Sequence, residues 1–471
     1  MNRQKELAKN TAILTVGKIC TQFVNFFLLP LYTAVLSTTE YGTYDLLISY
    51  SAILLPLVNL QLDQGLFRYI LDCRNDTKKQ SEVFSTLVFF STLQGIVFLV
   101  LYKIVSSFFY IEYGFFLAIY VMLSLYVGIL MQLLRGLGKN ASFAIASFIS
   151  VTTTTVMNVL ALVVFRLGVK GLFVATIVSQ VVTILFLVIS TKCYKYFSIS
   201  NIKYNIFISV LKYSFPLIPN DLAWWVVNAS DRVIVSKILG VAMNGIYAAA
   251  NKFSTMFINF YNVLNLSWTE SVSVHFQDED RDTYLSETIT YLFNFFSSLG
   301  YILISLMPFL YPLLINEAYR DGYNHVYILI VAMLFRVLVG LYSTIYIAQK
   351  NTKEVAITSV LAAVINIVFN IALISKLNLY AASISTLAAF AFMFLFRYYD
   401  VNINRKMKVA IKKSIILRNV GMISILAVTY YDHNMILNIV AIIISILYGI
   451  FSNLDIIKSI RQAVIKKVIA T

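Results

Sequence analysis

Residues 171–191 read GLFVATIVSQVVTILFLVIST, a run of 21 positions without a charged side chain. A helix of about 20 mostly apolar residues is long enough to cross the hydrocarbon core of a bilayer. Similar runs recur along the whole chain, in which 59% of the 471 residues are hydrophobic and only 13% are charged. A soluble protein of this length could not bury so much apolar surface. The sequence therefore predicts an all-α, polytopic membrane protein.

Charged or turn-rich breaks separate the apolar runs into fourteen expected transmembrane helices. These are residues 11–36, 44–67, 83–108, 113–134, 142–165, 171–191, 213–239, 244–268, 286–315, 324–348, 355–375, 379–399, 414–431 and 434–452. An even number of spans places both termini on one side of the membrane. Most of the 37 Lys and Arg residues lie in the tails and loops on that side, including the loop charges from Arg397 to Arg418. The positive-inside rule then predicts cytoplasmic termini.

A weak internal repeat indicates how the spans are grouped. Short matches recur at a near-constant spacing: Leu36-Ser37, Gly42 and Tyr44 with Leu239-Gly240, Gly245 and Tyr247, and Lys139-Asn140 with Lys350-Asn351. Because six spans separate the copies, the two halves have the same orientation and form a parallel repeat. We expect a first lobe over 1–203, a second over 204–400, and a basic linker, two further spans and a cytoplasmic tail over 401–471. Two six-helix lobes of this kind leave a central cleft between them.

Polar side chains at helical spacing mark the faces that we expect to line this cleft, since lipid-facing surfaces should be apolar. The predicted cleft cations are Lys18, Arg68, Lys252 and Arg336, and the polar and aromatic lining residues are Gln22, Asn25, Asn59, Trp224, Asn228 and Asn259. Asp63 and Asp231 are the candidates for ion coupling. The alternatives are that the amides only hydrogen-bond neighbouring helices, and that the cations near span ends reach the lipid headgroups or set orientation.

All 6 prolines fall within predicted spans. Proline removes an intrahelical hydrogen bond and bends a helix, so Pro30, Pro56, Pro216 and Pro219 are hinge candidates, unless they only mark span ends. The 3 cysteines and 3 histidines are scattered, so we expect no metal site and no cofactor. The chain has no phosphate-binding loop for nucleotide hydrolysis, and no loop is long enough to fold a catalytic domain.

Four segments resemble Wzx-type polysaccharide (O-antigen repeat-unit) flippases of the multidrug/oligosaccharidyl-lipid/polysaccharide exporter superfamily. They are residues 40–44 (EYGTY), Gly65-Leu66 with Arg68, residues 213–219 (YSFPLIP) continuing to Ser230-Asp231-Arg232, and residues 245–252 (GIYAAANK). Residues 374–382 (ISKLNLYAA) depart from the family's usual Ile-Pro-x-x-Gly-x-x-Gly-Ala turn. The resemblance implies the two-lobe, fourteen-span exporter fold over the whole chain.

The resemblance also implies a function. Such a flippase moves an undecaprenyl-diphosphate-linked oligosaccharide from the cytoplasmic to the outer leaflet of a bacterial cytoplasmic (inner) membrane, for an O-antigen, a capsule or another polysaccharide. Transport would proceed by alternating access, driven by the membrane potential or an ion gradient, and a polysaccharide polymerase and a chain-length regulator would be partners. The cleft cations would neutralise the diphosphate. Two alternatives stay open: a drug/cation antiporter of the same fold, and a membrane-embedded polymerase or acyltransferase.

Overall fold

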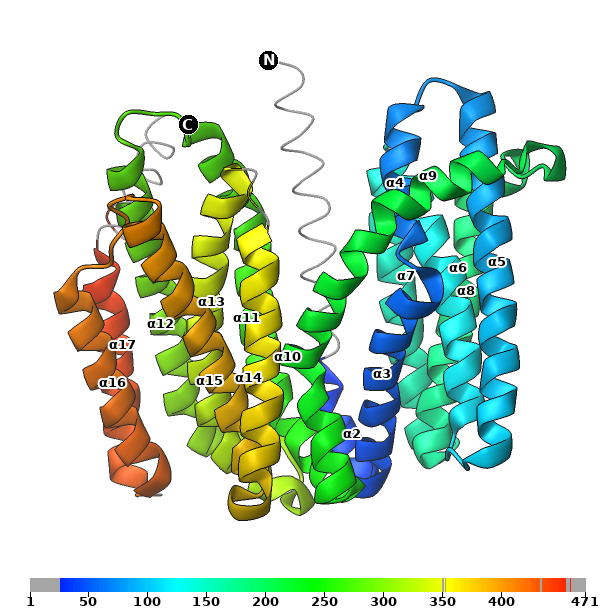
Figure 1. Cartoon of the computed structure of the whole chain (residues 1–471). Coiled ribbons are helices and arrows are strands. Elements are labelled where there is room, and N and C mark those ends of the chain that lie inside the picture. The colour runs from blue at the N-terminus through cyan, green and yellow to red at the C-terminus, as the bar shows by residue number, and fades with distance from the viewer. Residues whose placement is uncertain (1–25, 350, 352, 433, 455–457, 459–471) are drawn as a thin grey trace, which may run out of the picture. The chain divides into compact units, whose positions relative to one another are not determined.

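The computed structural model describes residues 26–349, 351, 353–432, 434–454 and 458 (Figure 1). Within these residues every regular element is a helix, which confirms the predicted all-α class. Of the described helices, 11 are long and apolar enough to cross a membrane, so the chain is a multi-pass membrane protein. The exact number of fourteen spans stays a prediction.

The chain forms two compact units, residues 1–245 and 246–471. The described α-helices of the first unit are α2 (Leu29–Val35), α3 (Thr38–Asn59), α4 (Leu62–Asp72), α5 (Thr77–Phe108), α6 (Gly114–Gly136), α7 (Asn140–Val159), α8 (Gly168–Thr191), α9 (Tyr204–Ser214) and α10 (Ile218–Ile238). α9 contacts α4 and α5, and α10 contacts α3, which is why both belong to this unit. The predicted lobe boundary at 203/204 stays a prediction.

The interior of the first unit is built on the short helix α4. Its buried residues Leu62, Leu66 and Ile70 recur every four positions and therefore share one face. This face joins the buried side chains of α6, among them Ile129 and Leu133, in one hydrophobic cluster. α4 is thus fixed by apolar packing, although it is too short to cross a bilayer on its own.

The predicted span over 44–67 is not one helix. Leu60 and Gln61 have φ angles of 49° and 57°, in the left-handed region, and they separate α3 from α4. A left-handed residue other than glycine costs about 1–2 kcal/mol. Asn59 therefore ends one helix while Asp63 lies in the first turn of the next.

The second unit contains most of α11 (Val241–His275) and the remaining helices. These are α12 (Arg281–Leu314), the 3-10 helix η5 (Glu317–Gly322), α13 (Tyr323–Ala348), α14 (Lys353–Leu377), α15 (Leu379–Tyr399), the π-helix η6 (Asp400–Asn404), α16 (Lys413–Asp432) and α17 (Met435–Ser452). α13 is the central helix, since most of its span is buried, whereas α17 is largely exposed. Polar bonds hold the last two helices on α12: Tyr301 to Asn419 Oδ1 (2.7 Å) and Asn453 to Ser298 (3.0 Å).

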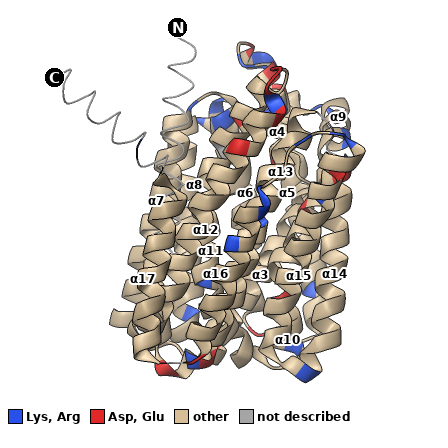
Figure 2. Cartoon of the chain, turned by 90° about the vertical axis from the view of Figure 1, so that its left-hand side faces the viewer, with Lys and Arg blue, Asp and Glu red and all other residues tan. Residues whose placement is uncertain are grey.

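Three helices in each unit pack on one another in a similar way, while the predicted repeat of six spans stays a prediction. α8 packs on both α6 and α7, and α15 packs on both α13 and α14 in the same way. The matching turns Leu36-Ser37 and Leu239-Gly240 directly precede α3 and α11. Ser37 and Glu40 form a reciprocal capping box at the start of α3, while Gly240 has a φ of 100° before α11. Figure 2 shows long uncharged stretches of helix, with most charged residues toward the helix ends.

Candidate functional site

Several of the predicted site residues fall outside the described part of the chain or at helix breaks. Lys18, Gln22 and Asn25 lie outside the described residues. Pro30 lies in the first turn of α2 and Pro56 inside α3. Pro216 lies in the 3-10 helix η4 (Phe215–Leu217) and Pro219 in the first turn of α10, so both mark the change from α9 to α10. Their role as hinges stays a prediction.

The break between α3 and α4 brings together two predicted site residues. The amide of Asn59 donates to Asp63 Oδ1 at 2.8 Å, and its carbonyl oxygen accepts from Ser91 of α5 at 3.3 Å. Gln64 donates to the other carboxylate oxygen of Asp63 at 3.2 Å. A carboxylate is also favoured in the first turn of a helix, where backbone N–H groups point outward. Asn59 and Asp63 therefore form one polar cluster, which we name the break cluster together with Ser91 and Gln64.

Gln61 connects the break to α10. Its amide donates to Asp221 Oδ2 at 2.6 Å, across a separation of 160 residues in sequence. Sequence reasoning missed both residues, because a glutamine in a left-handed backbone has no local signal that identifies its partner.

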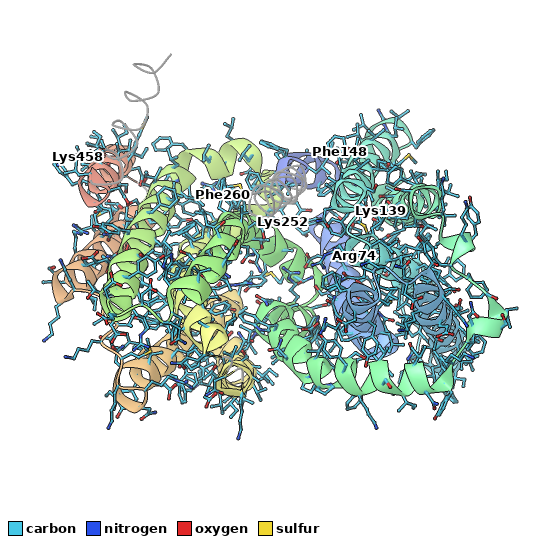
Figure 3. All side chains as sticks on the ribbon, turned by 90° about the horizontal axis from the view of Figure 1, so that it is seen from above. Arg74, Lys139, Phe148, Lys252, Phe260 and Lys458 are labelled. Carbon is cyan, nitrogen blue, oxygen red and sulfur yellow. The ribbon has the colours of Figure 1, made fainter. Side chains whose placement is uncertain are left out.

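Arg135 is a cation that the sequence did not identify as a site residue. It lies in the last turn of α6 and is partly buried. Its guanidinium carbon lies 4.5 Å from the ring centre of Phe67, and it donates to Gln132 at 2.9 Å. Arg74 and Lys139 lie at the same end of this unit (Figure 3), where Arg74 donates to the carbonyl of Gly136 at 2.9 Å. This end of the first unit is strongly basic.

Arg68, one of the predicted cleft cations, lies on α4 beyond the break. Its guanidinium is 2.6 Å from Asp72, and both side chains are at least half exposed, at 50% and 61%. An exposed pair of this kind contributes little to stability, about 0–1 kcal/mol. The guanidinium of Arg68 could therefore leave Asp72 and bind another anion at little cost in stability.

α3 and α10 are joined by a buried ion pair. Arg232 Nε lies 3.4 Å from Asp45 Oδ2, with side chains 19% and 8% exposed, and Arg232 also donates to Ser49 at 3.2 Å. Asp231 is buried, and its carboxylate accepts the backbone N–H of Arg232 at 2.9 Å.

The predicted aromatic and amide residues of α10 are only partly buried. Asn228 donates to the backbone carbonyl of Trp224 at 2.6 Å, so its N–H₂ group has a partner within the helix. The neighbouring Trp225 donates to the carbonyl of Ser49 at 2.8 Å, which strengthens the contact between α10 and α3.

In the second unit, the predicted residues lie on α11 and α13. Lys252 and Asn259 are seven positions apart on α11 and both partly buried, and Figure 3 shows Lys252 and Phe260 on this helix. Arg336 is partly buried on α13, with its guanidinium carbon 5.5 Å from the ring centre of Phe390.

One arginine that was expected in a basic loop is fully buried. Arg397 is 0% exposed, and its guanidinium donates to Thr358 Oγ1 from Nε and Nη2 at 3.1 and 2.9 Å, to the carbonyls of Val339 and Val355, and to Ser343. Its prediction as an orientation charge in a loop is wrong, because neutral oxygens of α13 and α14 satisfy its donors inside the unit.

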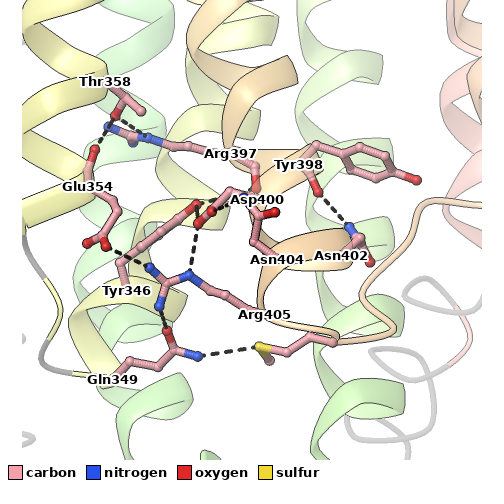
Figure 4. Close-up of polar contacts among 11 residues, drawn as sticks. Tyr346, Gln349, Glu354, Thr358, Arg397, Tyr398, Asp400, Asn402, Asn404 and Arg405 are labelled. Carbon is pink, nitrogen blue, oxygen red and sulfur yellow. Dashed lines mark hydrogen bonds and ion pairs between the residues drawn. The ribbon is translucent and has the colours of Figure 1, made fainter.

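A second arginine completes this network, as Figure 4 shows. Arg405 lies 2.9 Å from Asp400 Oδ2 and 3.5 Å from Glu354 Oε1, and the hydroxyl of Tyr346 donates to Asp400 at 2.9 Å. The network joins the ends of α13, α14 and α15. We assign it a structural role, because it ties these helix ends together within the second unit.

An apolar cavity of about 290 Å³ lies among α12, α13, α15 and α16. Its wall is almost entirely apolar and includes Phe293, Leu338, Phe394 and Val420. The polar side chains among its lining residues are those of Asn419 and Tyr398. A bound aliphatic chain would therefore remove water from few polar groups. Among the described residues, no three His, Cys, Asp or Glu side chains gather as a metal site.

Two of the solved structures that share this fold are a flippase and a multidrug transporter by their descriptions. The lipid II flippase MurJ in an inward closed conformation has a TM-score of 0.71 at 15% identity, covering 97% of this chain and 99% of that one. An inward-facing multidrug resistance MATE transporter of the MOP superfamily has a TM-score of 0.67 at 14% identity, covering 83% and 99%. At these identities the likeness shows the fold alone.

Comparison with the curated proteins finds no match. The sequence profile of one protein family does match, over residues 7–268, which is more than half of the chain and includes α3 to α10 and the break cluster. The chain therefore belongs to the family of polysaccharide biosynthesis proteins.

Proposed function

We propose that this protein is a flippase for an undecaprenyl-diphosphate-linked oligosaccharide. The observation that carries the proposal is the combination of partly buried cations on long helices with the all-helical architecture of the described residues. Lys252 and Arg336 are partly buried on α11 and α13, and charged side chains within helices of a membrane protein are rare and commonly mark the path of a substrate. Cations in such positions are suited to an anionic substrate such as a diphosphate.

The two chemical parts of this substrate need different surroundings. The diphosphate and sugars need polar or cationic partners, and the residues at hand are the cations above together with Asn59, Asn228 and Asn259. The lipid tail needs an apolar surface, and the cavity lined by Phe293 and Phe394 offers one within the second unit. The head would cross along these polar side chains while the tail stays in the apolar phase.

Energy for outward movement would come from the membrane potential, with Asp63 and Asp231 as candidates for ion coupling. Moving one negative charge outward down a negative-inside potential releases about 2.3 kcal/mol per 100 mV. Membership in the polysaccharide biosynthesis family supports a sugar-containing substrate, and the matching flippase and exporter folds support transport. We place the protein in a bacterial inner membrane with both termini in the cytoplasm.

The test uses purified full-length protein in vesicles that contain a fluorescent lipid-linked oligosaccharide. An enzyme added outside cleaves only the sugar exposed in the outer leaflet, and chromatography reports the length of the sugar chain. We expect the exposed fraction to rise with unchanged chain length, and to rise faster under a potential that drives anions outward. A longer chain would indicate a polymerase, and an exposed fraction equal to that of protein-free vesicles would refute the proposal.

A further inference from the structure

A cavity of about 580 Å³ opens in the second unit, where α12 ends and η5 leads into α13. This end of the unit is the extracytoplasmic one if the termini are cytoplasmic, as proposed above. The volume falls within the range of about 300–1,000 Å³ that is typical of small-molecule sites. α17 closes one side of the cavity through Asn438, so one of the two helices outside the repeat contributes to its wall.

The wall of this cavity is rich in hydrogen-bond acceptors. Pro308 and Pro312 of α12 both line the cavity, and because Pro312 has no N–H group, the carbonyl of Pro308 receives no intrahelical hydrogen bond from the residue four positions on. Glu317 and Asp321 add two exposed carboxylates. A ligand that matches this wall must bring several donors.

Asn438 independently indicates a ligand. Its side chain lines the cavity and is only 6% exposed, and its amide makes no hydrogen bond to another described residue. By contrast, Asn453 on the same helix bonds to Ser298. Buried polar groups in folded proteins are nearly always hydrogen-bonded, so the amide of Asn438 is set for a partner that enters the cavity.

The remaining wall is rigid and partly apolar. The ring of Tyr323 stacks on that of Tyr430 at 4.4 Å, and the Tyr323 hydroxyl donates to the Tyr430 carbonyl at 3.1 Å. Ile315 and the proline rings supply aliphatic surface. Arg320, which lies 3.9 Å from Glu317, offsets one of the two carboxylates and supplies a donor.

We propose that this cavity is a binding site for a neutral sugar residue. Sugar hydroxyls are donors for the acceptor-rich wall and acceptors for Asn438 and Arg320, and the C–H face of the ring fits against the prolines and Ile315. Arg320 pairs with Glu317 rather than with Asp321, so the negative charge of Asp321 would repel an acidic sugar. This inference rests on the proposed function: the occupant would be a terminal sugar of the oligosaccharide held at the outer surface after its head has crossed.

The test measures binding of free sugars to the full-length protein in nanodiscs prepared without sugar-based detergent. The probes are glucose, N-acetylglucosamine and lactose, with glucuronate as the acidic member, and saturation-transfer NMR reports binding. Glu317→Gln removes a wall carboxylate and Asn438→Phe fills the cavity. Glu279→Gln is the matched control, since Glu279 is exposed in the loop between α11 and α12.

We expect at least one neutral sugar to bind, glucuronate to bind at least ten-fold more weakly, and both wall variants to weaken binding about ten-fold while the control does not. A preference for glucuronate, or neutral binding that neither wall variant changes, would overturn the inference. A diazirine derivative of the bound sugar tests the unmodified protein. Crosslinks should fall in residues 304–324 or 435–441, and crosslinks only elsewhere would overturn the site even if a variant failed to fold.

The leaflet assay separates this inference from the proposed function. If the protein translocates the headgroup normally but does not bind sugar at this cavity, only the inference is overturned. Sugar binding at the cavity without headgroup translocation would overturn the proposed function and leave the site in place.

Discussion

Gly65 on α4 leaves space for α9, and replacing it with alanine should displace that helix. A Cβ atom built on Gly65 would lie 2.3 Å from Cγ1 of Val210, which is 0% exposed on α9. Carbon atoms in contact normally lie about 3.5–4.0 Å apart, so the two helices would have to separate by more than about 1 Å. Figure 1 shows α9 lying across α4, where this contact forms.

The expected cost of Gly65→Ala is that of an overpacked interior, about 1–3 kcal/mol. Val210→Ala alone should cost about 2 kcal/mol, because two buried methyl groups are lost. In the double variant the new methyl group occupies space that Val210 has vacated. The double variant should therefore be less destabilised than the sum of the single variants, by a coupling energy of about 0.5–3 kcal/mol.

The assay is thermal unfolding of the purified variants in nanodiscs, with limited proteolysis of the loop 192–203 that precedes α9. Gly421→Ala is the matched control, since a Cβ atom there would meet nothing within 4 Å. We expect Gly65→Ala to melt earlier and to be cleaved faster, and Gly421→Ala to behave like the unchanged protein. If Gly65→Ala has unchanged stability, or if the double variant shows only the sum of the two single effects, the packing argument is wrong.

Two further predictions concern other parts of the molecule. Arg397→Met should lower the free energy of unfolding by about 1–3 kcal/mol, because the hydroxyl of Thr358 and other buried acceptors lose a hydrogen-bond donor. Lys376→Met, at an exposed position, should have little effect, and thermal unfolding measures both variants. The backbone N–H of Lys79 bonds to Asp76, the N-cap of α5, and lowers the pKa of that carboxyl. The stabilisation from this ionised cap is therefore present above the pKa of the unfolded chain and is lost as pH falls through the lowered pKa. Asp76→Asn should remove this pH dependence, and melting curves of both proteins over acidic pH would contradict the reasoning if they stayed parallel.

The helical class was predictable because it depends on average properties of long segments. A run such as residues 171–191 has too little polar surface for any other environment. Errors of a few residues at the boundaries do not affect such conclusions.

The break at Leu60 and Gln61 could not be predicted, since neither residue is a glycine and neither favours a left-handed backbone. Its stability depends on tertiary partners, among them Ser91 for Asn59 and Asp221 for Gln61. The same reason explains why the sequence grouped Asn59 with Asp63 but did not identify the break between them.

The burial and the partners of charged side chains were the hardest features to predict from the sequence. Arg397 lies next to a basic stretch and was expected in a loop, yet its donors are satisfied inside the second unit. Arg232 has an acidic neighbour in sequence, but its ion pair is with the distant Asp45. Whether a charge is buried depends on acceptors supplied by other helices, which local sequence does not reveal.

The central claim is that cations on membrane-spanning helices carry the diphosphate headgroup across. The most direct measurement is the rate of headgroup translocation in vesicles for Lys252→Gln and Arg336→Gln, each checked for unchanged folding, with Lys376→Gln as the exposed control. We predict at least a ten-fold slower rate for the two interior variants and an unchanged rate for the control. Rates for Lys252→Gln and Arg336→Gln equal to that of the unchanged protein would contradict the account.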